Sequence, residues 1–575
     1  MTTYAQDYLK TVVPSQLISE RGSNLVVINP GSANVRVGFA HQQVPFSVRH
    51  CIARYFKRQS DGPNHSFLQD EMLNCEASPN QNLERERAYD IIASLLKIPF
   101  LDEEAPSSSL PPKMGRIDSF APQQGRSDSV FTWTNVKEKV SKPPQADEST
   151  STVLPSSEEH KYRGVIFGED ALKVSPSEPY CLRRPIRRGH FNISQNYSFQ
   201  QVCEDIIAIW NWILTEKLNI HLKDRSSYSA ILVLPESFDN REIKEMLSIV
   251  LRDLRFSTAV VHQEGLAAAF GNGLSTACVV NIGAQVTSVI CIEDGVAIPA
   301  TTLTLPFGGE DITRCFLWAQ KRRQTWPSIL TDPLRKPIDL LMLNKLRETY
   351  CQIREGAFDS VAVVQSYEQD KPVSTHKTKL SALNVPPMGL FYPKIFAHEE
   401  YPPPPRSWFN DSEDMLEDTW NMEYAGANTG LGIWDSYYPV YPTRLKKYDN
   451  VGLAEAIVSS ILSTGRIDLQ RKLFCSIQLI GGVASTIGLV AAVEDRVLHA
   501  IPSNEAIDTV EVLQSRSEPS YVSWKGGAII GILDFGREAW IHREDWIKNG
   551  IHVGSGRKYK DSYFLQSQAM CYYNA

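Results

Sequence analysis

The sequence predicts an α/β protein, and three observations lead to this fold class. Hydrophobic residues make up 42% of the 575 residues and charged residues 22%, a balance typical of a globular chain with a large core. Strand-like runs such as residues 230–234 occur among helix-like runs such as residues 199–214. A weak internal repeat also begins two separate parts of the chain.

The repeat consists of two predicted β-hairpins, VVINPGSANVRVGF at residues 26–39 and VVNIGAQVTSVICIEDG at residues 279–295. Each has the pattern of a strand, an Asn-x-Gly turn and a second strand. Such turns can present successive backbone N–H groups to an anion, so two of them facing each other across a cleft could hold the phosphates of one nucleotide. The alternative is that each is only a hairpin.

Two glycine pairs give a further signal. IQLIGGVASTI at residues 477–487 predicts a strand, a Gly-Gly break and the start of a helix, and WKGGAII at residues 524–530 repeats the glycine pair. Because glycine has no side chain, bare backbone at both places could lie against a flat ligand.

Charge and cysteine content limit the classes of function. The chain has 59 basic and 66 acidic residues, a net charge of -7, so contact with nucleic acid would need a local basic patch. Ten cysteines without a CxxC pair favour a reducing compartment over a disulfide framework or zinc module, and we expect the thiols in the core. No metal site is predicted.

The sequence predicts neither a signal peptide nor a membrane span. The amino terminus, MTTYAQDYLK, lacks the apolar core of a signal peptide, so we expect an intracellular protein. Residues 265–292 and 473–493 lack charge over long stretches, but polar residues and glycines interrupt both. Buried strands joined by turns explain them better.

Two segments of biased composition are predicted to be insertions. Residues from about 102 to 159 are rich in Ser, Pro and charge, which predicts a mostly disordered insertion. Residues from about 398 to 449 begin HEEYPPPPRSW, where the prolines favour polyproline II, and continue with the acidic run DSEDMLEDTWNMEY. We expect a surface insertion that could serve as a docking strip.

Six ordered motifs resemble the actin and actin-related proteins over nearly the whole chain. Beside the two hairpins and the two glycine pairs, FGGEDIT (307–313) resembles the segment that leads into the fourth subdomain, and PPMGLFYPKIF (386–396) resembles a later segment of that lobe. Within the family, ARYFKRQ (53–59), RRPIRRGHFNI (183–193) and VVHQEGLAAAFGNGLST (260–276) look like the nuclear class of actin-related protein 8, or 9 in plant usage.

The resemblance implies the actin fold, with two α/β lobes and four subdomains around a central nucleotide cleft. It assigns residues 22–44, 185–271 and 524–575 to subdomain 1, 45–184 to subdomain 2, 272–307 and 450–523 to subdomain 3, and 308–449 to subdomain 4. The two insertions then fall in subdomains 2 and 4.

The residues that align with the family's catalytic machinery are substituted. Asn29 and Asn281 stand where active members have the aspartates that help to hold magnesium. Glu264 aligns with the glutamine that orients the attacking water, and Ser288 with the histidine that assists it. The resemblance therefore implies no efficient ATPase and weak holding of magnesium. Glu264 acting as a base is an alternative, although a triphosphate would repel its charge.

Other positions that hold nucleotide in the family are retained, so weak binding of ATP is expected. Pro30, Ala33, Ala284 and Gln285 depart from the pattern around them. The alternative to nucleotide binding is a purely structural role, in which the retained residues only stabilise the junction of the lobes. They are Gly31, Ser32, Arg36, Gly283, Arg347, Glu348, Gly481 and Gly482.

The nuclear class implies a structural and interaction subunit of an Ino-eighty chromatin remodeller, with roles in transcription and DNA repair. The expected location is the nucleus, with the cytoplasm as a second place, and the expected partners are nuclear actin, other actin-related proteins and a remodeller motor. The alternative is an ATP-hydrolysing, actin-like cytoskeletal protein. A filament is not expected, because AHEEYPPPPR (397–406) replaces the apolar plug of actin.

Two surfaces are predicted to meet partners. The family's groove for the helicase-SANT-associated helix of a motor aligns with Phe270, Ile529, Ile530, Leu533 and Phe535, although their spacing also fits a core-facing helix. A basic strip with Arg54, Lys57, Arg183 and Arg187 could bind nucleosomal or linker DNA. The alternative is that these arginines bind carbonyls or carboxylates within the protein.

Overall fold

The structure is a computed structural model, and it describes residues 21–56, 77–98, 164–175, 178–194, 196–238, 240–333, 336–367, 373–397, 451–503, 505, 507–533 and 540–549. Both predicted insertions lie outside these residues, as do Lys57 and Phe535.

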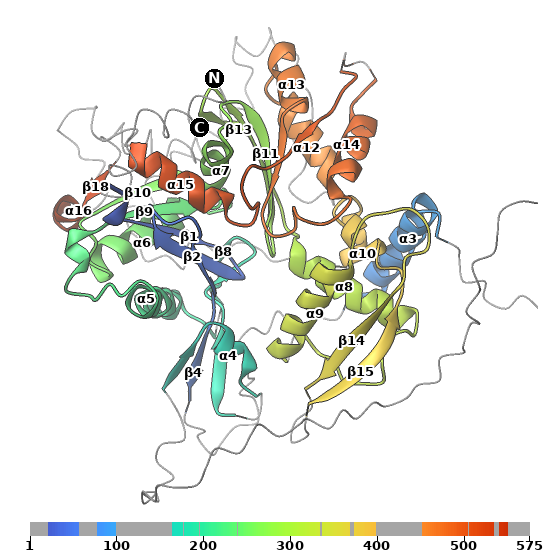
Figure 1. The fold of residues 1–575 in the computed structure, drawn as a ribbon, viewed down its shortest axis with the longest axis horizontal. Coiled ribbons are helices and arrows are strands. Elements are labelled where there is room, and N and C mark those ends of the chain that lie inside the picture. The colour runs from blue at the N-terminus through green and yellow to red at the C-terminus, as the bar shows by residue number, and fades with distance from the viewer. Residues whose placement is uncertain are drawn as a thin grey trace, which may run out of the picture.

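Two sheets form the centres of two lobes, which confirms the α/β class (Figure 1). The six-stranded sheet has the order β18-β10-β9-β1-β2-β3 and the five-stranded sheet the order β13-β12-β11-β16-β17. Smaller sheets are β5-β4-β6, β14-β15 and β7-β8. The strands are β1 (Leu25–Pro30), β2 (Asn34–Phe39), β3 (Phe46–Arg49), β4 (Ile52–Tyr55), β5 (Val165–Phe167), β6 (Tyr180–Arg183), β7 (Ile186–Arg187), β8 (His190–Phe191), β9 (Ser229–Leu234), β10 (Thr258–Gln263), β11 (Ala277–Ile282), β12 (Thr287–Glu293), β13 (Val296–Leu305), β14 (Ser360–Ser366), β15 (Ser374–Leu380), β16 (Ile477–Ile480), β17 (Val512–Leu513) and β18 (Ile541–His542).

Helices pack on both faces of each large sheet, whereas α4, α9 and part of α8 pack with the small sheets. They are α3 (Pro79–Leu95), α4 (Glu169–Lys173), α5 (Phe199–Glu216), α6 (Asn240–Ser248), α7 (Glu264–Asn272), α8 (Gly309–Arg322), α9 (Pro337–Tyr350), α10 (Val385–Met388), α12 (Leu453–Leu462), α13 (Ile467–Phe474), α14 (Leu489–Ala500), α15 (Val522–Leu533) and α16 (Arg543–Asn549). Short turns are η3 (Arg225–Ser227) and η5 (Pro393–Phe396), and η4 (Ile249–Asp253) is a π-helical turn.

The predicted repeat is confirmed as a repeat of topology. β1 and β2 pair antiparallel, and β1 also pairs parallel with β9. In the other lobe β11 and β12 pair antiparallel, and β11 pairs parallel with β16. Each lobe therefore presents one hairpin turn toward the space between the lobes, beside the carboxyl end of a parallel strand.

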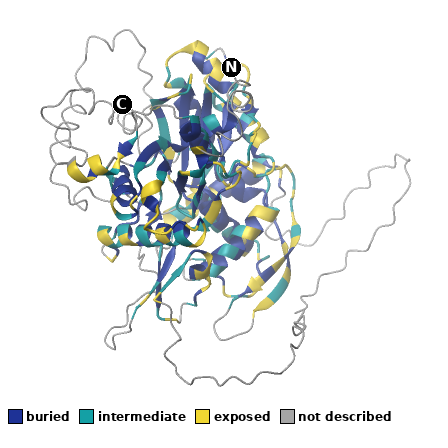
Figure 2. Cartoon of the chain, turned by 60° about the vertical axis from the view of Figure 1, so that its left-hand side comes forward, coloured by how far each residue is buried: buried dark blue, intermediate teal, exposed yellow. Residues whose placement is uncertain are grey.

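Alternating side chains of the strands join different faces of the core. Val26 and Ile28 pack with α5 and the segment around α6, whereas Val27 packs with α15 on the opposite face. This alternation is the period of two that a strand imposes. Figure 2 shows the buried residues concentrated in the strands and on the inner sides of the helices.

The second glycine pair does not have the predicted role. Residues 524–530 lie wholly inside α15, and a Cβ at Gly526 would overlap the carbonyl oxygen of Ala267 in α7. A Cβ at Gly527 would collide with Val233 of β9. This pair lets α15 approach α7 and the sheet, so its bare backbone faces protein rather than a flat ligand.

The helix α3 lies within the range predicted for subdomain 2 but packs outside the small sheet of that range. We assigned residues 45–184 to that subdomain, but α3 packs against η5 and α10 in the other lobe (Figure 1). Tyr89 and Ile92 are 2% and 0% exposed there, in one cluster with Cys315 and Phe396. The physical reason is that the buried face of α3 finds its apolar partners far along the chain.

The described cysteines are free, and most are buried, as expected for core thiols. In the part of the chain that the structure describes, no helix is both long and apolar enough to cross a membrane. The uncharged residues 265–292 and 473–493 contain α7, β11 and β12 in one case and β16 with parts of two helices in the other, so strands account for only part of them. No group of three or more potential metal ligands occurs among the described residues.

Candidate functional site

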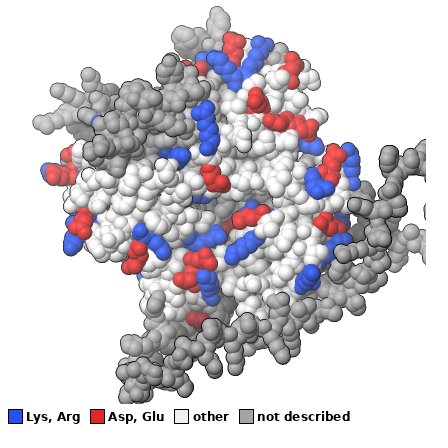
Figure 3. All heavy atoms as spheres, viewed as in Figure 1, with Lys and Arg blue, Asp and Glu red and all other residues white. Residues whose placement is uncertain are grey.

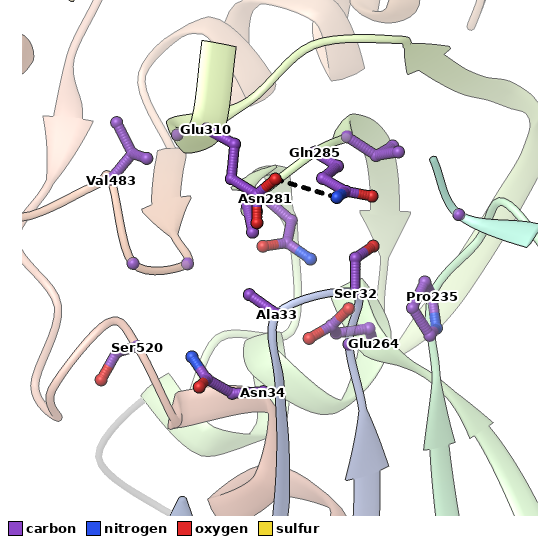
Figure 4. Close-up of a pocket in the computed structure, with 18 of the residues that line it drawn as sticks. Ser32, Ala33, Asn34, Pro235, Glu264, Asn281, Gln285, Glu310, Val483 and Ser520 are labelled. Carbon is purple, nitrogen blue, oxygen red and sulfur yellow. Dashed lines mark hydrogen bonds between the residues drawn. The ribbon is translucent and has the colours of Figure 1, made fainter. Parts of the chain in front are cut away.

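A cavity of about 150 Å³ lies between the two lobes, where the two hairpin turns meet. Every residue predicted to hold nucleotide lines it, from both lobes: Gly31, Ser32, Arg36, Gly283, Arg347, Glu348, Gly481 and Gly482. The substituted residues Glu264, Asn281 and Ser288 line it too, and Asn29 is buried beside them. In Figure 4, Ser32 and Glu264 lie at one end of the cavity, and Val483 and Ser520 at the other.

The two turns have matching geometry. The Gly31 N–H donates to the Asn34 carbonyl at 2.9 Å, and the Gly283 N–H donates to the Val286 carbonyl at 2.9 Å. Directly behind them, Asn29 is paired with Arg36 in one hairpin and Asn281 with Ser288 in the other. One N–H group of each predicted phosphate turn is therefore already used inside the turn.

Glu264 is the centre of a buried polar cluster at the hairpin end of the cavity. Asn29 Nδ2 donates to Glu264 Oε1 at 3.2 Å and to the Val233 carbonyl at 2.9 Å, and Asn281 also bonds Glu264. Burial raises the pKa of Glu264 to about 7, and the nearby Glu236 adds to the rise, whereas Arg36 and the two amides oppose it. The asparagines thus serve as donors to this carboxyl.

Glu236 belongs to the same cluster, although the sequence analysis missed it. Its Oε1 accepts from the Gly265 N–H at 2.5 Å and its Oε2 from the Ser288 hydroxyl at 2.9 Å. Burial raises the pKa of Glu236, and these bonds partly offset the rise. No motif surrounds this residue, but its place just after the buried strand β9 was a usable signal, because ligands gather at the carboxyl ends of parallel strands.

The cluster also contains one buried positive charge, the guanidinium of Arg36. Burial lowers the pKa of Arg36, and Glu264 opposes that effect. The guanidinium lies 3.5 Å from Asn29 Oδ1, so it faces the carboxyl cluster as well as the cavity. Arg36 therefore compensates part of the buried negative charge.

The other end of the cavity suits a flat group better. Gly481 has a φ of 91°, which favours glycine, and a Cβ there would collide with the Ile282 carbonyl. No atom lies within 4 Å of the place where a Cβ of Gly482 would be, so bare backbone borders open space. Arg347 and Glu348 of α9 bond each other at 2.7 Å beside it.

Comparison with known proteins identifies the family of this chain. The family model described as Actin matches residues 21–557. The chain belongs to the actin family. It is 67% identical to "Actin-related protein 9" of Oryza sativa subsp. japonica over 99% of this chain and 100% of the relative. It is 60% identical to "Actin-related protein 9" of Arabidopsis thaliana, over 99% of this chain and 98% of the relative.

A solved structure agrees with this assignment. "Human actin-related protein Arp8 in its ATP-bound state" superposes with a TM-score of 0.70 at 26% identity, covering 97% of this chain and 99% of that chain. The predicted actin fold and the resemblance to the class of actin-related protein 8 and plant protein 9 are confirmed.

The described residues of the predicted partner groove, which exclude Phe535, lie along α7 and α15. Phe270, Ile529 and Leu533 are half-buried, and Phe270 packs at the edge of two core clusters. Ile530 is 5% exposed and packs with Val27 and Ile231. For Ile530 this arrangement favours the core alternative, while the groove as a whole stays a prediction.

The arginines predicted for DNA mostly contact protein groups. Arg54 bonds the buried Asp205 at 2.5 Å, and Arg183 lies 3.6 Å from the same carboxylate. Arg187 is 6% exposed. These positions favour the alternative that the arginines bind carboxylates within the protein. On the cleft face, Figure 3 shows basic and acidic side chains interspersed rather than a strip of one sign.

Proposed function

We propose that this chain is a non-filamentous nuclear actin-related protein, a structural and interaction subunit of an Ino-eighty-type chromatin remodeller, with a cleft that binds ATP weakly and does not turn it over efficiently. The inference that ATP is not turned over efficiently rests on one observation. Five side chains bond one another in a buried cluster, namely Glu264, Glu236, Asn29, Asn281 and Ser288. The remodeller role is supported by the similarity to actin-related proteins 8 and 9.

The cluster is a poor site for magnesium and for activating water. At 4 Å a lost unit charge removes about 4 kcal/mol of attraction for a unit charge at an effective dielectric of about 20. Asn29 and Asn281 carry no charge, and the Ser288 hydroxyl donates to Glu236. The remaining carboxyls, Glu264 and Glu236, both have a raised pKa, which lowers their tendency to be ionised.

The residues fit a nucleotide better than they fit its metal. Gly481, Gly482, Arg347 and Glu348 would border the base and ribose, and Ser32 with the two turns would border the phosphates. The similar human protein is described in an ATP-bound state. Weak binding of ATP without tightly held magnesium therefore agrees best with the site.

The position of α3 supports the absence of filaments. In actin the segment after the LFYPKIF-like motif carries the apolar plug, and here that motif ends in η5. α3 packs on η5, and Lys394 of η5 lies 3.6 Å from Glu84 of α3. A helix of the same chain thus covers the side of the lobe from which a plug would start.

Turnover of ATP tests the catalytic part of this proposal. The purified full-length chain is expected to release phosphate from magnesium-ATP no faster than a heat-inactivated sample, because its water-positioning groups are substituted or engaged. Asn29→Asp with Asn281→Asp is expected to strengthen magnesium-ATP binding only when combined with Glu264→Gln, since the two new carboxyls together with Glu264 and Glu236 would otherwise place four neighbouring carboxyls that resist ionisation. Rapid magnesium-dependent hydrolysis by the unmodified chain would instead support the cytoskeletal alternative.

Affinity purification from nuclei tests the structural role. The tagged chain is expected to retain a remodeller motor, nuclear actin and other actin-related proteins through high-salt washes. Recovery of the chain alone from nuclei that contain an intact remodeller would contradict the subunit role.

A further inference from the structure

A group of buried ion pairs joins the two lobes at the cavity. Arg188 lies in the turn between β7 and β8, which packs on the six-stranded sheet, and Asp311 lies in the first turn of α8 in the other lobe. Arg188 NH1 donates to Asp311 Oδ2 at 2.5 Å and NH2 to Oδ1 at 2.7 Å. The two side chains are 8% and 2% exposed, so this bidentate pair is almost free of water.

Gln285 and Glu310 extend the contact. The Arg188 N–H donates to Gln285 Oε1 at 2.9 Å, and its guanidinium donates to the Gln285 carbonyl at 2.9 Å. Gln285 Nε2 donates to Glu310 Oε2 at 3.0 Å, as the dashed line in Figure 4 marks. Arg184 lies 3.4 Å from Glu310 Oε1. Gln285 departs from the family's usual glycine, and here its side chain takes part in the bridge.

The backbone holds both ends of the bridge in place. Arg188 and Gly189 have φ values of 48° and 78°, the pattern of a two-residue type I′ hairpin turn. Arginine is uncommon in this left-handed region, and the turn is fixed by the close approach of Gly189 to Ser237. At the other end, Asp311 Oδ2 accepts from the Gly308 N–H at 2.9 Å, which orients the carboxylate at the start of α8.

We propose that Arg184, Arg188, Gln285, Glu310 and Asp311 form a latch that keeps the cleft closed without a nucleotide. Opening the lobes would break the bidentate Arg188–Asp311 pair and the Arg184–Glu310 pair, both of which cross the cleft in a largely buried setting, and breaking buried ion pairs is strongly unfavourable. A subunit of the proposed structural kind needs a constant shape for its partners, and in this respect the inference rests on the proposed function. The latch supplies that shape while the phosphate end of the cleft is degenerate.

Hydrogen–deuterium exchange of the full-length chain tests the latch. Peptides that cover residues 184–193, 281–288 and 305–315 are followed in the nucleotide-free chain, with small-angle scattering of the same samples. Arg188→Ala is expected to speed exchange in all three segments and to increase the radius of gyration. Gln285→Gly is expected to act in the same direction but less strongly, because it removes hydrogen bonds and no charge.

A matched control breaks an ion pair that does not cross the cleft. Lys97 bonds Glu355 at 2.6 Å, and these side chains are 70% and 66% exposed, so Lys97→Ala should leave all three segments unchanged. If Arg188→Ala fails to fold, the result for Gln285→Gly decides.

Two results would overturn the latch. One is exchange in both variants equal to that of the unmodified chain. The other is an unmodified chain that exchanges rapidly and is protected only after ATP or ADP is added. Loss of the remodeller from nuclear purifications would contradict the proposed function and would leave the exchange result unaffected.

Discussion

At the scale of single residues, the substitutions at the phosphate end depend on one another. Aspartate at positions 29 and 281 would place two more carboxyls against Glu264 and Glu236, and such a group could not ionise together. With asparagine at both positions, two amides donate to Glu264 instead. The two asparagines and the glutamate are therefore mutually dependent parts of one hydrogen-bonded cluster.

The burial of Glu264 predicts a pH-dependent cost in stability. The pKa of Glu264 is raised from 4.5 to about 7, so folded and unfolded chains are both protonated below about pH 4.5 and no cost arises there. Between these values only the unfolded chain releases the proton, and stability falls as the pH rises. Above about pH 7 the cost is constant at about 3 kcal/mol.

Glu264→Gln is therefore expected to stabilise the protein in a pH-dependent way. The gain should be small near pH 5 and reach about 3 kcal/mol near pH 8. Urea denaturation at both values measures it. Glu348→Gln, at a side chain that is 60% exposed in the same cavity, controls for the loss of one carboxylate. A gain that is equal at both pH values would show that the burial of charge is not its cause.

At the scale of elements, one helix pair positions the site. α7 begins with Glu264 at the cavity and packs along α15, where glycines on both helices allow the close approach. A Cβ at Gly271 would lie 2.5 Å from the Val522 carbonyl oxygen, and one at Gly526 would overlap the Ala267 carbonyl. The obstructing atoms belong to backbone, which cannot rotate away.

Gly526→Ala is accordingly expected to destabilise the protein by about 1–3 kcal/mol or more, the usual cost of overpacking. The two helices must separate, which also shifts the start of α7. Thermal unfolding compared with Gly164→Ala provides the measurement, because no atom lies within 4 Å of a Cβ at Gly164. Similar losses in the two variants would argue against tight packing of α7 on α15.

The same pair shows where prediction from the sequence stops. The hairpins were predicted because strand, turn and strand lie next to one another, and their registers agree with the repeat. A glycine pair indicates only that another group, from the protein or from a ligand, packs closely against the backbone at that point. At residues 481–482 the backbone borders the cavity, whereas at residues 526–527 it borders α7 and β9. The sequence around each pair does not distinguish these two environments.

At the scale of the molecule, the unpredicted features are contacts between distant parts of the chain. Arg188 and Asp311 are 123 positions apart, and Glu86 of α3 and Arg322 of α8 are 236 apart. The predicted residues of the cavity were found from local motifs and from the family resemblance that these motifs carry, because each turn has its own pattern. No local sequence pattern predicts the latch or the packing of α3, since each depends on contacts between segments that are far apart in the chain.

The helix α3 connects the two lobes, because it is joined in sequence to strands of one lobe and packs on the other. It follows β4 of the small sheet β5-β4-β6 and precedes β5 of that sheet, yet it packs on the opposite lobe. Arg85 stacks over Trp318 at 4.1 Å and Arg322 over Tyr89 at 4.0 Å, and Ile92 is fully buried. Its neighbour Ile91 is 50% exposed, so the two isoleucines face opposite environments.

Ile92→Asp is expected to detach α3, because a carboxylate in that apolar site would be buried without a partner. The helix should lose protection from hydrogen exchange, and the uncovered surface around Phe396 should promote self-association, visible in sedimentation velocity. Ile91→Asp, one residue away on the exposed face, should change stability by no more than about 0.5 kcal/mol and leave the chain monomeric. If both variants kept α3 protected and sedimented alike, the proposal that the docking of α3 prevents self-association through this lobe would be contradicted.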